Sequence, residues 1–207
     1  MKRVFNLLVV DESGSMSIIE RQALVGINET LTTIQKMQKT HKEMEQRVTL
    51  ITFDSTHKKL FYDNVSAHHA NPLKSRDYNP CGGTPLYDAI GMGIAKINAL
   101  TTEDDSVLVT IITDGEENCS EEYDLKMIKN LIEKLKKQNW TFTFIGTDDL
   151  DVENIAQNMG IDNHLQFSED EAGTKAMFAR ENRARERYNK CRAMDCKMEA
   201  GSYFEEK

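Results

Sequence analysis

The stretch VFNLLVVDESGSM, residues 4–16, joins a run of apolar residues to a short loop of oxygen-bearing side chains. A near-continuous apolar run of this length is typical of a strand that is buried on both faces of a parallel sheet. SVLVTIIT at 106–113 and WTFTFIG at 140–146 are similar runs of mostly apolar or β-branched residues. In RVTLITF at 47–53, apolar and polar residues alternate somewhat more. These four runs predict the strands of a central sheet.

Helical patterns separate the predicted strands. Apolar residues recur at steps of three and four from Leu24 to Met37, and again from Leu125 to Leu135, so each segment presents one apolar stripe to a sheet. Alternating strands and helices imply an α/β domain, doubly wound, whose mostly parallel central sheet carries helices on both faces. KLFYDNV at 59–65 is expected to return after a turn as one antiparallel edge strand.

The length of 207 residues suits one compact domain with an appended segment. We assign residues 1–170 to the domain and residues 171–207 to a C-terminal helix that packs partly on it and ends in a charged tail. The later turns of this helix carry little apolar surface, which leaves two interpretations: a solvated, frayed tail or a helix that binds a partner.

Charge and hydropathy exclude several classes of function. The formal net charge of −8 argues against a nucleic-acid partner, because phosphate binding usually rests on a basic surface. The N-terminal apolar run is only about seven residues long and ends at an aspartate, which does not fit a signal peptide. No other run approaches the roughly 20 residues that span a bilayer. We therefore expect a cytoplasmic protein with no membrane partner.

The four cysteines, Cys81, Cys119, Cys191 and Cys196, contain no C-x-x-C pair. A zinc site is therefore disfavoured, because the close pair at 191 and 196 lacks a second pair at suitable spacing. In a reducing compartment we expect all four to be free thiols.

Oxygen-bearing side chains follow the predicted strands at three places. Asp11, Ser13 and Ser15 follow the first strand, Thr84 precedes a helix in CGGTPLYDAI, and Asp114 lies in TDGEEN, which directly follows VLVTII. If the first strand and the 106–113 strand are neighbours, these side chains meet beyond the carboxyl ends of the strands. Magnesium prefers six oxygen ligands and is usually held by one or two carboxylates. Two carboxylates and three hydroxyls therefore predict a magnesium site that can accept a further carboxylate.

The segments DESGSM, GGTPLYDAI and ITDGEEN, in this order, resemble the metal-ion-dependent adhesion site of the von Willebrand factor type A domain family. That site consists of a D-x-S-x-S loop, a threonine and an aspartate. The resemblance spans roughly residues 1–170. It carries over to the five residues named above and to no others.

This resemblance implies a Rossmann-like fold, a bound Mg²⁺ or Mn²⁺, and recognition of a protein partner whose Glu or Asp completes the coordination shell. The chain looks most like stand-alone intracellular bacterial members of the family. Some of these are associated with tellurite resistance and with chaperone-like ATPases, so the implied partner is a chaperone-like ATPase or a stress-response protein.

Two other functions are compatible with the same residues. A metal-dependent phosphoryl-transfer enzyme would use Asp11 as nucleophile and Asp114 to hold magnesium, but it would want a second acid where the chain has Ser13. A scaffold would use the metal only structurally. The sequence favours a non-enzymatic binding module over both. The nearby acids Asp88, Glu116 and Glu117 suit either tuning of the site or helix-start and surface roles.

Overall fold

The central strand, β1 (Lys2–Asp11), is buried along almost its whole length because its side chains are apolar on both faces. In the computed structural model, which describes residues 2–196 and 198–205, it lies between β2 (Met44–Phe53) and β4 (Ser106–Thr113). Both neighbours run parallel to it. The first strand and the 106–113 strand are therefore neighbours, which is the arrangement that the predicted site requires.

The sheet has the strand order β3-β2-β1-β4-β5-β6. Within the described residues, β3 (Lys58–Ser66) is the antiparallel strand, and β5 (Trp140–Thr147) and β6 (Asn163–Phe167) continue the parallel pairing. The predicted fold class is confirmed, including its antiparallel edge. β6 was not predicted from the sequence, because NHLQF has only five residues and two apolar side chains.

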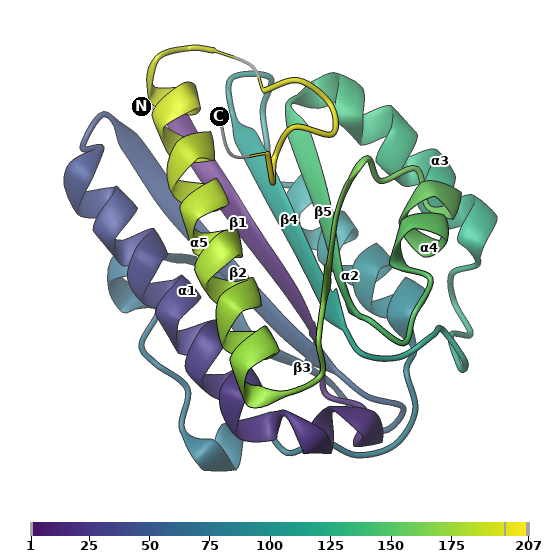
Figure 1. Cartoon of the computed structure of the whole chain (residues 1–207). Helices are drawn as coiled ribbons and strands as arrows, with labels where there is room; N and C mark the ends of the chain where they lie inside the picture. Colours follow the sequence, from purple (N-terminus) through teal and green to yellow (C-terminus); the bar gives the residue numbers. More distant parts are fainter. Residues whose placement is uncertain (1, 197, 206–207) are drawn as a thin grey trace.

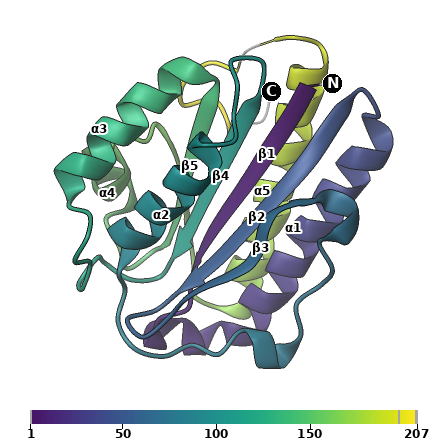
Figure 2. The same cartoon turned by 180° about the vertical axis from the view of Figure 1, so that it is seen from behind.

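Helices cover both faces of the sheet, with α1 and α5 on one face and α2 and α3 on the other (Figures 1 and 2). Successive side chains of β1 alternate between two apolar cores, one beneath α1 and α5 and the other beneath α2, α3 and α4. None of the described helices is long and apolar enough to cross a membrane. The helices are α1 (Glu20–Thr40), α2 (Leu86–Asn98), α3 (Leu125–Leu135), α4 (Val152–Asn158) and α5 (Glu171–Ala193).

The later turns of α5 are buried against the sheet, so residues 171–193 are not a frayed tail. Both apolar and polar side chains make these contacts. Arg185 donates hydrogen bonds to Asn6 Oδ1 (2.7 Å), to Thr110 Oγ1 (2.8 Å) and to Glu181 Oε1 (2.7 Å). A count of apolar side chains underestimates the docking of this helix, because polar residues face polar partners inside the domain. The domain boundary at residue 170 stays a prediction.

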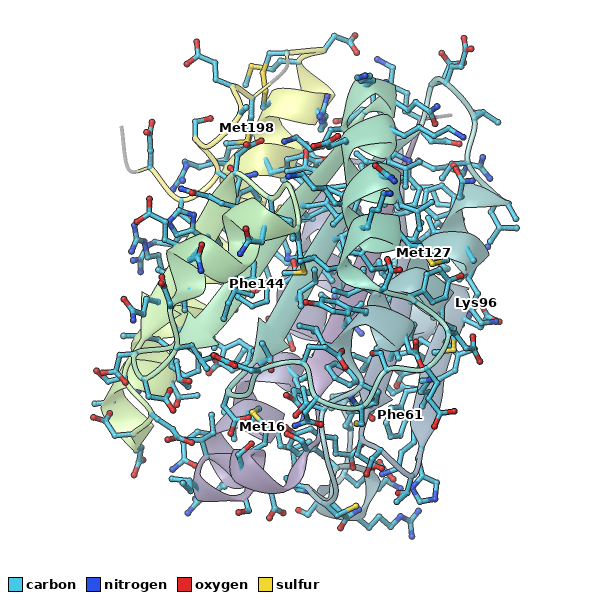
Figure 3. All side chains as sticks on the ribbon, turned by 90° about the vertical axis from the view of Figure 1, so that its right-hand side faces the viewer. Met16, Phe61, Lys96, Met127, Phe144 and Met198 are labelled. Carbon is cyan, nitrogen blue, oxygen red and sulfur yellow. A yellow bond between two sulfur atoms is a disulfide. The ribbon has the colours of Figure 1, made fainter. Side chains whose placement is uncertain are left out.

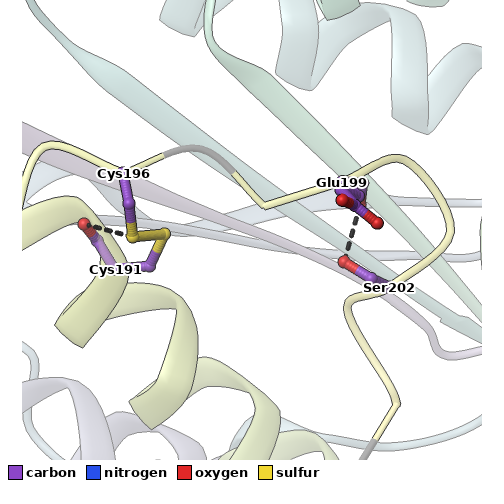
Figure 4. Close-up of a disulfide and its surroundings, with 4 residues drawn as sticks. All are labelled: Cys191, Cys196, Glu199 and Ser202. Carbon is purple, nitrogen blue, oxygen red and sulfur yellow. Dashed lines mark hydrogen bonds between the residues drawn. A yellow bond between two sulfur atoms is a disulfide. The ribbon is translucent and has the colours of Figure 1, made fainter.

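The turn after α5 contains a disulfide between Cys191 and Cys196 (Figure 4). The expectation of four free thiols was therefore wrong for this pair, and it holds for Cys81 and Cys119. The pair can form because the chain turns back after the helix, which leaves the two Cα atoms 5.0 Å apart. Beyond the turn, the Tyr203 backbone amide donates to Asn163 Oδ1 at 3.0 Å and ties the segment to β6.

Candidate metal-binding site

The candidate site lies at the carboxyl edge of the sheet, where the strand order reverses. From β1 the chain proceeds to β2 on one side, and from β4 it proceeds to β5 on the other. Such a reversal opens a crevice between the two loops that follow the strands. Asp11 is the last residue of β1, and Asp114 is the first residue after β4. In Figure 3, Met16 marks this edge and Met198 marks the opposite end of the molecule.

A continuous series of hydrogen bonds connects four of the five predicted residues. The Ser13 backbone amide donates to Asp11 Oδ1 at 2.7 Å. The hydroxyls of Ser13 and Ser15 lie 3.2 Å apart, and Ser15 Oγ donates to Asp114 Oδ1 at 2.7 Å. The first loop and the loop after β4 therefore meet directly, as the sequence predicts.

Thr84, the fifth residue, faces the same space as the others. A Cβ placed on Gly115 would lie 3.1 Å from Thr84 Oγ1, 3.7 Å from Ser15 Oγ and 4.0 Å from Asp11 Oδ2. Three of the predicted oxygens thus surround one point that a side chain at position 115 would fill. The absence of a side chain on Gly115 keeps this point open.

Hydrogen bonds fix the Thr84 loop to the other two loops. The Thr84 backbone amide donates to the side-chain oxygen Oδ1 of Asn118 at 2.9 Å, and the Asn118 backbone amide donates to the Thr84 carbonyl at 3.2 Å. The Gly14 amide donates to the Gly82 carbonyl at 3.0 Å. The three loops form one hydrogen-bonded unit, so their oxygens are preorganised.

Glu12 is an anchor of the site that the sequence analysis missed. It is fully buried, and it accepts hydrogen bonds from Thr52 Oγ1, from the Asn79 amide and from Lys59 Nζ, the last at 2.6 Å. Side chains alternate along a strand, so a charge next to Asp11 faces away from it and needs a partner elsewhere. In the sequence, Lys59 at the start of the predicted return strand was the one feature that could have indicated a partner for Glu12.

The other nearby acids have structural roles or lie in solvent. Asp88 accepts hydrogen bonds from three successive backbone amides at 121–123 and from Lys58 Nζ at 3.0 Å. Glu117 accepts from the Tyr87 amide at 2.9 Å, in the first turn of α2. Glu116 is exposed. Asp88 and Glu117 therefore hold the loop after β4 against α2, which satisfies free amides at a helix start.

Without a bound cation, burial disfavours the ionised form of the two carboxylates of the site. It raises the pKa of Asp11 to about 6 against the hydrogen bond from Thr113, and it raises the pKa of Asp114 to about 6 against the hydrogen bond from Ser15. Asp114 Oδ2 is buried and has no hydrogen-bond partner within the described residues. A buried carboxylate oxygen without a partner is costly, so this atom fits a missing positive group.

The donor set is mixed, with two carboxylates and three hydroxyls. Among the described residues, no group of three or more His, Cys, Asp or Glu side chains is placed to hold a metal ion. A cation at this edge would therefore depend on the hydroxyls as well as on the acids. Such a set suits a hard cation such as magnesium better than a softer metal such as zinc.

Comparisons with known proteins agree with this architecture. The sequence profile of the von Willebrand factor type A domain matches residues 7–189. No curated protein sequence matches the chain. The match covers far more than half of the chain and includes all five predicted site residues.

Solved structures of similar fold include pilus proteins and an isolated domain. The pilus adhesin SpaC of Lactobacillus rhamnosus GG has a TM-score of 0.64 and 18% identity over 88% of this chain, which spans only 30% of SpaC. The VWA domain of SpRpn10 has a TM-score of 0.62 and 13% identity, with 86% of this chain and 94% of that domain covered. The vWF domain of the pilus tip protein Mfa5 of Porphyromonas gingivalis has a TM-score of 0.61 and 13% identity, with 88% and 95% covered. The chain belongs to the von Willebrand factor type A domain family.

Proposed function

We propose that this chain is a binding module that captures a Glu or Asp side chain of a partner protein through a divalent cation, Mg²⁺ or Mn²⁺. Domains of this family commonly mediate protein–protein interactions. The observation that carries the proposal is the convergence of two buried carboxylates and three hydroxyls at the strand-order reversal, with Asp114 Oδ2 left without a partner.

Each residue has a distinct part in this proposal. Asp11 and Asp114 supply the negative charge, and Ser13, Ser15 and Thr84 supply neutral oxygens. With so few anionic ligands, a bound cation would retain Lewis acidity toward an outside carboxylate. The chain itself keeps the donors in place through the loop contacts described above and keeps their common space open at position 115.

The surroundings of Asp11 disfavour the phosphoryl-transfer alternative. Asp11 is fully buried, and its two oxygens accept hydrogen bonds from the Ser13 amide and from Thr113 Oγ1. A phosphoryl group attached to this buried carboxylate would need much more room than a bare cation. Lys59, which reaches this edge from β3, is paired with Glu12 and is not free to steady a phosphate.

We also propose the kind of protein that the module binds. We favour a chaperone-like ATPase or a stress-response protein in the cytoplasm, on the strength of the motif resemblance alone. The structural neighbours SpaC and Mfa5 are pilus proteins, so capture of a surface protein is the competing outcome of a partner search.

The function is tested by titrating chelator-treated protein with Mg²⁺ or Mn²⁺, and then with a capped peptide that contains one glutamate. We expect the peptide to bind only with the metal present, and Thr84→Ala to weaken peptide capture more than metal binding, because one neutral ligand is lost. Thr32→Ala, on an exposed position of α1, is the matched control. Metal binding without metal-dependent capture of the peptide would favour the scaffold, and turnover of p-nitrophenyl phosphate would favour the enzyme.

Magnesium affinity is expected to fall as the pH is lowered through about 6. Asp11 and Asp114 each have a pKa of about 6, and each must be ionised to bind a cation, so protons and magnesium compete. Below this pH the affinity should drop by about tenfold per pH unit for each proton displaced. Calorimetry at about pH 5, 6 and 7.5 in buffers of different ionisation enthalpy measures both affinity and proton release. A flat profile would mean that these two acids are not the ligands.

A further inference from the structure

Three acidic residues border one side of the candidate site. Asp148 and Asp149 follow β5, and Glu169 follows β6; we call these three residues the acidic rim. Because β4, β5 and β6 are adjacent and parallel, the loops that follow them lie at the same edge of the sheet as Asp114. Asp148 and Asp149 are exposed and Glu169 is half-buried.

The acidic rim lies beside the site. Burial raises the pKa of Glu169, and the nearby charges of Asp114 and Asp149 raise it further. Thr147 Oγ1 donates to Asp149 Oδ1 and, at 3.4 Å, to the Asp114 carbonyl. The rim therefore adds negative charge to a site whose Asp114 Oδ2 already lacks a partner.

Local structure fixes the position of Glu169. Asp170 caps α5 by accepting a hydrogen bond from the Gly173 amide at 2.7 Å, and the Asp170 amide donates to the Ser168 carbonyl at 2.8 Å. A Cβ on Gly173 would lie 2.3 Å from the Ser168 carbonyl oxygen, so the turn is tight. The carboxylate of Glu169 is thus held at the site by a defined turn.

The opposite side of the site carries fewer unpaired acids. Asp54, buried just after β2, accepts hydrogen bonds from the Thr56 and His57 backbone amides. There the Ser55 hydroxyl accepts a hydrogen bond from the Gly83 amide at 2.9 Å. The lysines of β3 are neutralised, since Lys58 pairs with Asp88 at 3.0 Å and Lys59 pairs with Glu12 at 2.6 Å.

The basic residues at the starts of α1 and α5 have other acids near them. Arg21 and Lys175 line a groove between those helices together with Glu29 and Glu171, whose charges oppose theirs. The two sides of the site therefore differ in charge, and a ligand seated over it would experience that difference.

We propose that the partner presents its carboxylate next to a Lys or Arg residue, and that this basic residue lies on the acidic rim. The inference rests on the proposed function, because it concerns what flanks the captured carboxylate. A cation alone would favour any acidic surface. Three further carboxylates beside it repel a uniformly acidic patch and attract a patch of mixed charge, which selects among partners.

The proposal is tested with three capped nonapeptides that share a central glutamate and differ at the two positions three residues away. These positions hold lysine in the first peptide, glutamine in the second and glutamate in the third. With Mg²⁺ at low ionic strength, we expect the lysine peptide to bind about threefold to tenfold more tightly than the glutamine peptide, and the glutamate peptide to bind most weakly. Added salt should reduce the differences.

A triple variant of the rim, Asp148→Asn, Asp149→Asn and Glu169→Gln, should bind the three peptides with nearly equal affinity. The matched control carries the same loss of charge at exposed acids outside the rim, as Glu103→Gln, Asp104→Asn and Glu133→Gln, and should keep the ranking.

Equal binding of the three peptides to the wild type, or a ranking that survives in the rim variant, would overturn this inference and leave carboxylate capture intact. Failure of all three peptides to bind in a magnesium-dependent way would overturn both.

Discussion

Replacing Asp11 by asparagine is expected to abolish magnesium binding, with an affinity at least about a hundredfold lower, while the chain stays folded. Asp11 supplies one of only two carboxylates in the candidate site, and a neutral amide cannot replace that charge for a hard cation. Asparagine keeps the shape of the side chain and an oxygen that can accept from Ser13 or Thr113. The same substitution at Asp114 should have the same effect.

The same variant should be more stable than the metal-free wild type at neutral pH. Because the pKa of Asp11 is about 6 when folded and 3.8 is its ordinary value, the folded state favours the protonated acid. The contribution of this group to stability is complete below the ordinary pKa and is lost as the pH rises through about 6. At pH 7 asparagine should therefore raise the free energy of unfolding of the metal-free chain by up to about 3 kcal/mol, and the gain should vanish below about pH 4.

Calorimetric titration with magnesium and urea unfolding of the chelator-treated protein measure the two effects. Asp104→Asn, at an exposed acid on the other edge of the sheet, is the control and should change neither quantity appreciably. Wild-type magnesium affinity in the Asp11→Asn variant would refute the metal site. A variant less stable than the wild type at every pH would instead show that the ionised carboxylate stabilises the metal-free fold.

The strands and the site loops could be predicted from sequence because each has a local signature. Strands buried on both faces are continuous apolar runs, so β1, β4 and β5 are visible without any knowledge of their neighbours. The loop residues follow those strands directly, and parallel strands bring them to one edge. The predicted convergence of Asp11 and Asp114 required only that β1 and β4 be adjacent.

The features that sequence reasoning missed depend on pairs of residues far apart in the chain. Glu12 is indistinguishable from a surface acid until Lys59 and Thr52 are placed beside it. The position of Glu169 beside Asp114 depends on β6, a strand too short and polar to be recognised. Buried polar groups need specific partners, and the periodicity of apolar residues in the sequence does not indicate which residues those partners are.

Arg185 is the clearest example, and its replacement by methionine is expected to lower the free energy of unfolding by about 3–5 kcal/mol. This arginine is fully buried beneath α5, where its guanidinium donates to Glu181, Asn6 and Thr110. Methionine would fill much of the volume but leave the buried Glu181 carboxylate without its cation, with the hydroxyls of Tyr203 and Thr110 as its remaining donors. Uncompensated buried charge is far more costly than the loss of a pair on the surface.

Comparison with an exposed pair and with a double variant separates these effects in urea unfolding. Lys36→Met removes an exposed ion pair with Glu186 and should cost less than about 1 kcal/mol. Arg185→Met combined with Glu181→Leu should recover most of the lost stability, because no charge then remains buried. If the double variant is as unstable as the single one, the network contributes through its hydrogen bonds and geometry, and the buried-charge explanation is wrong. Recovery would mean that the ion pair adds little net stability, and that the single variant is unstable because it leaves a buried charge unpaired.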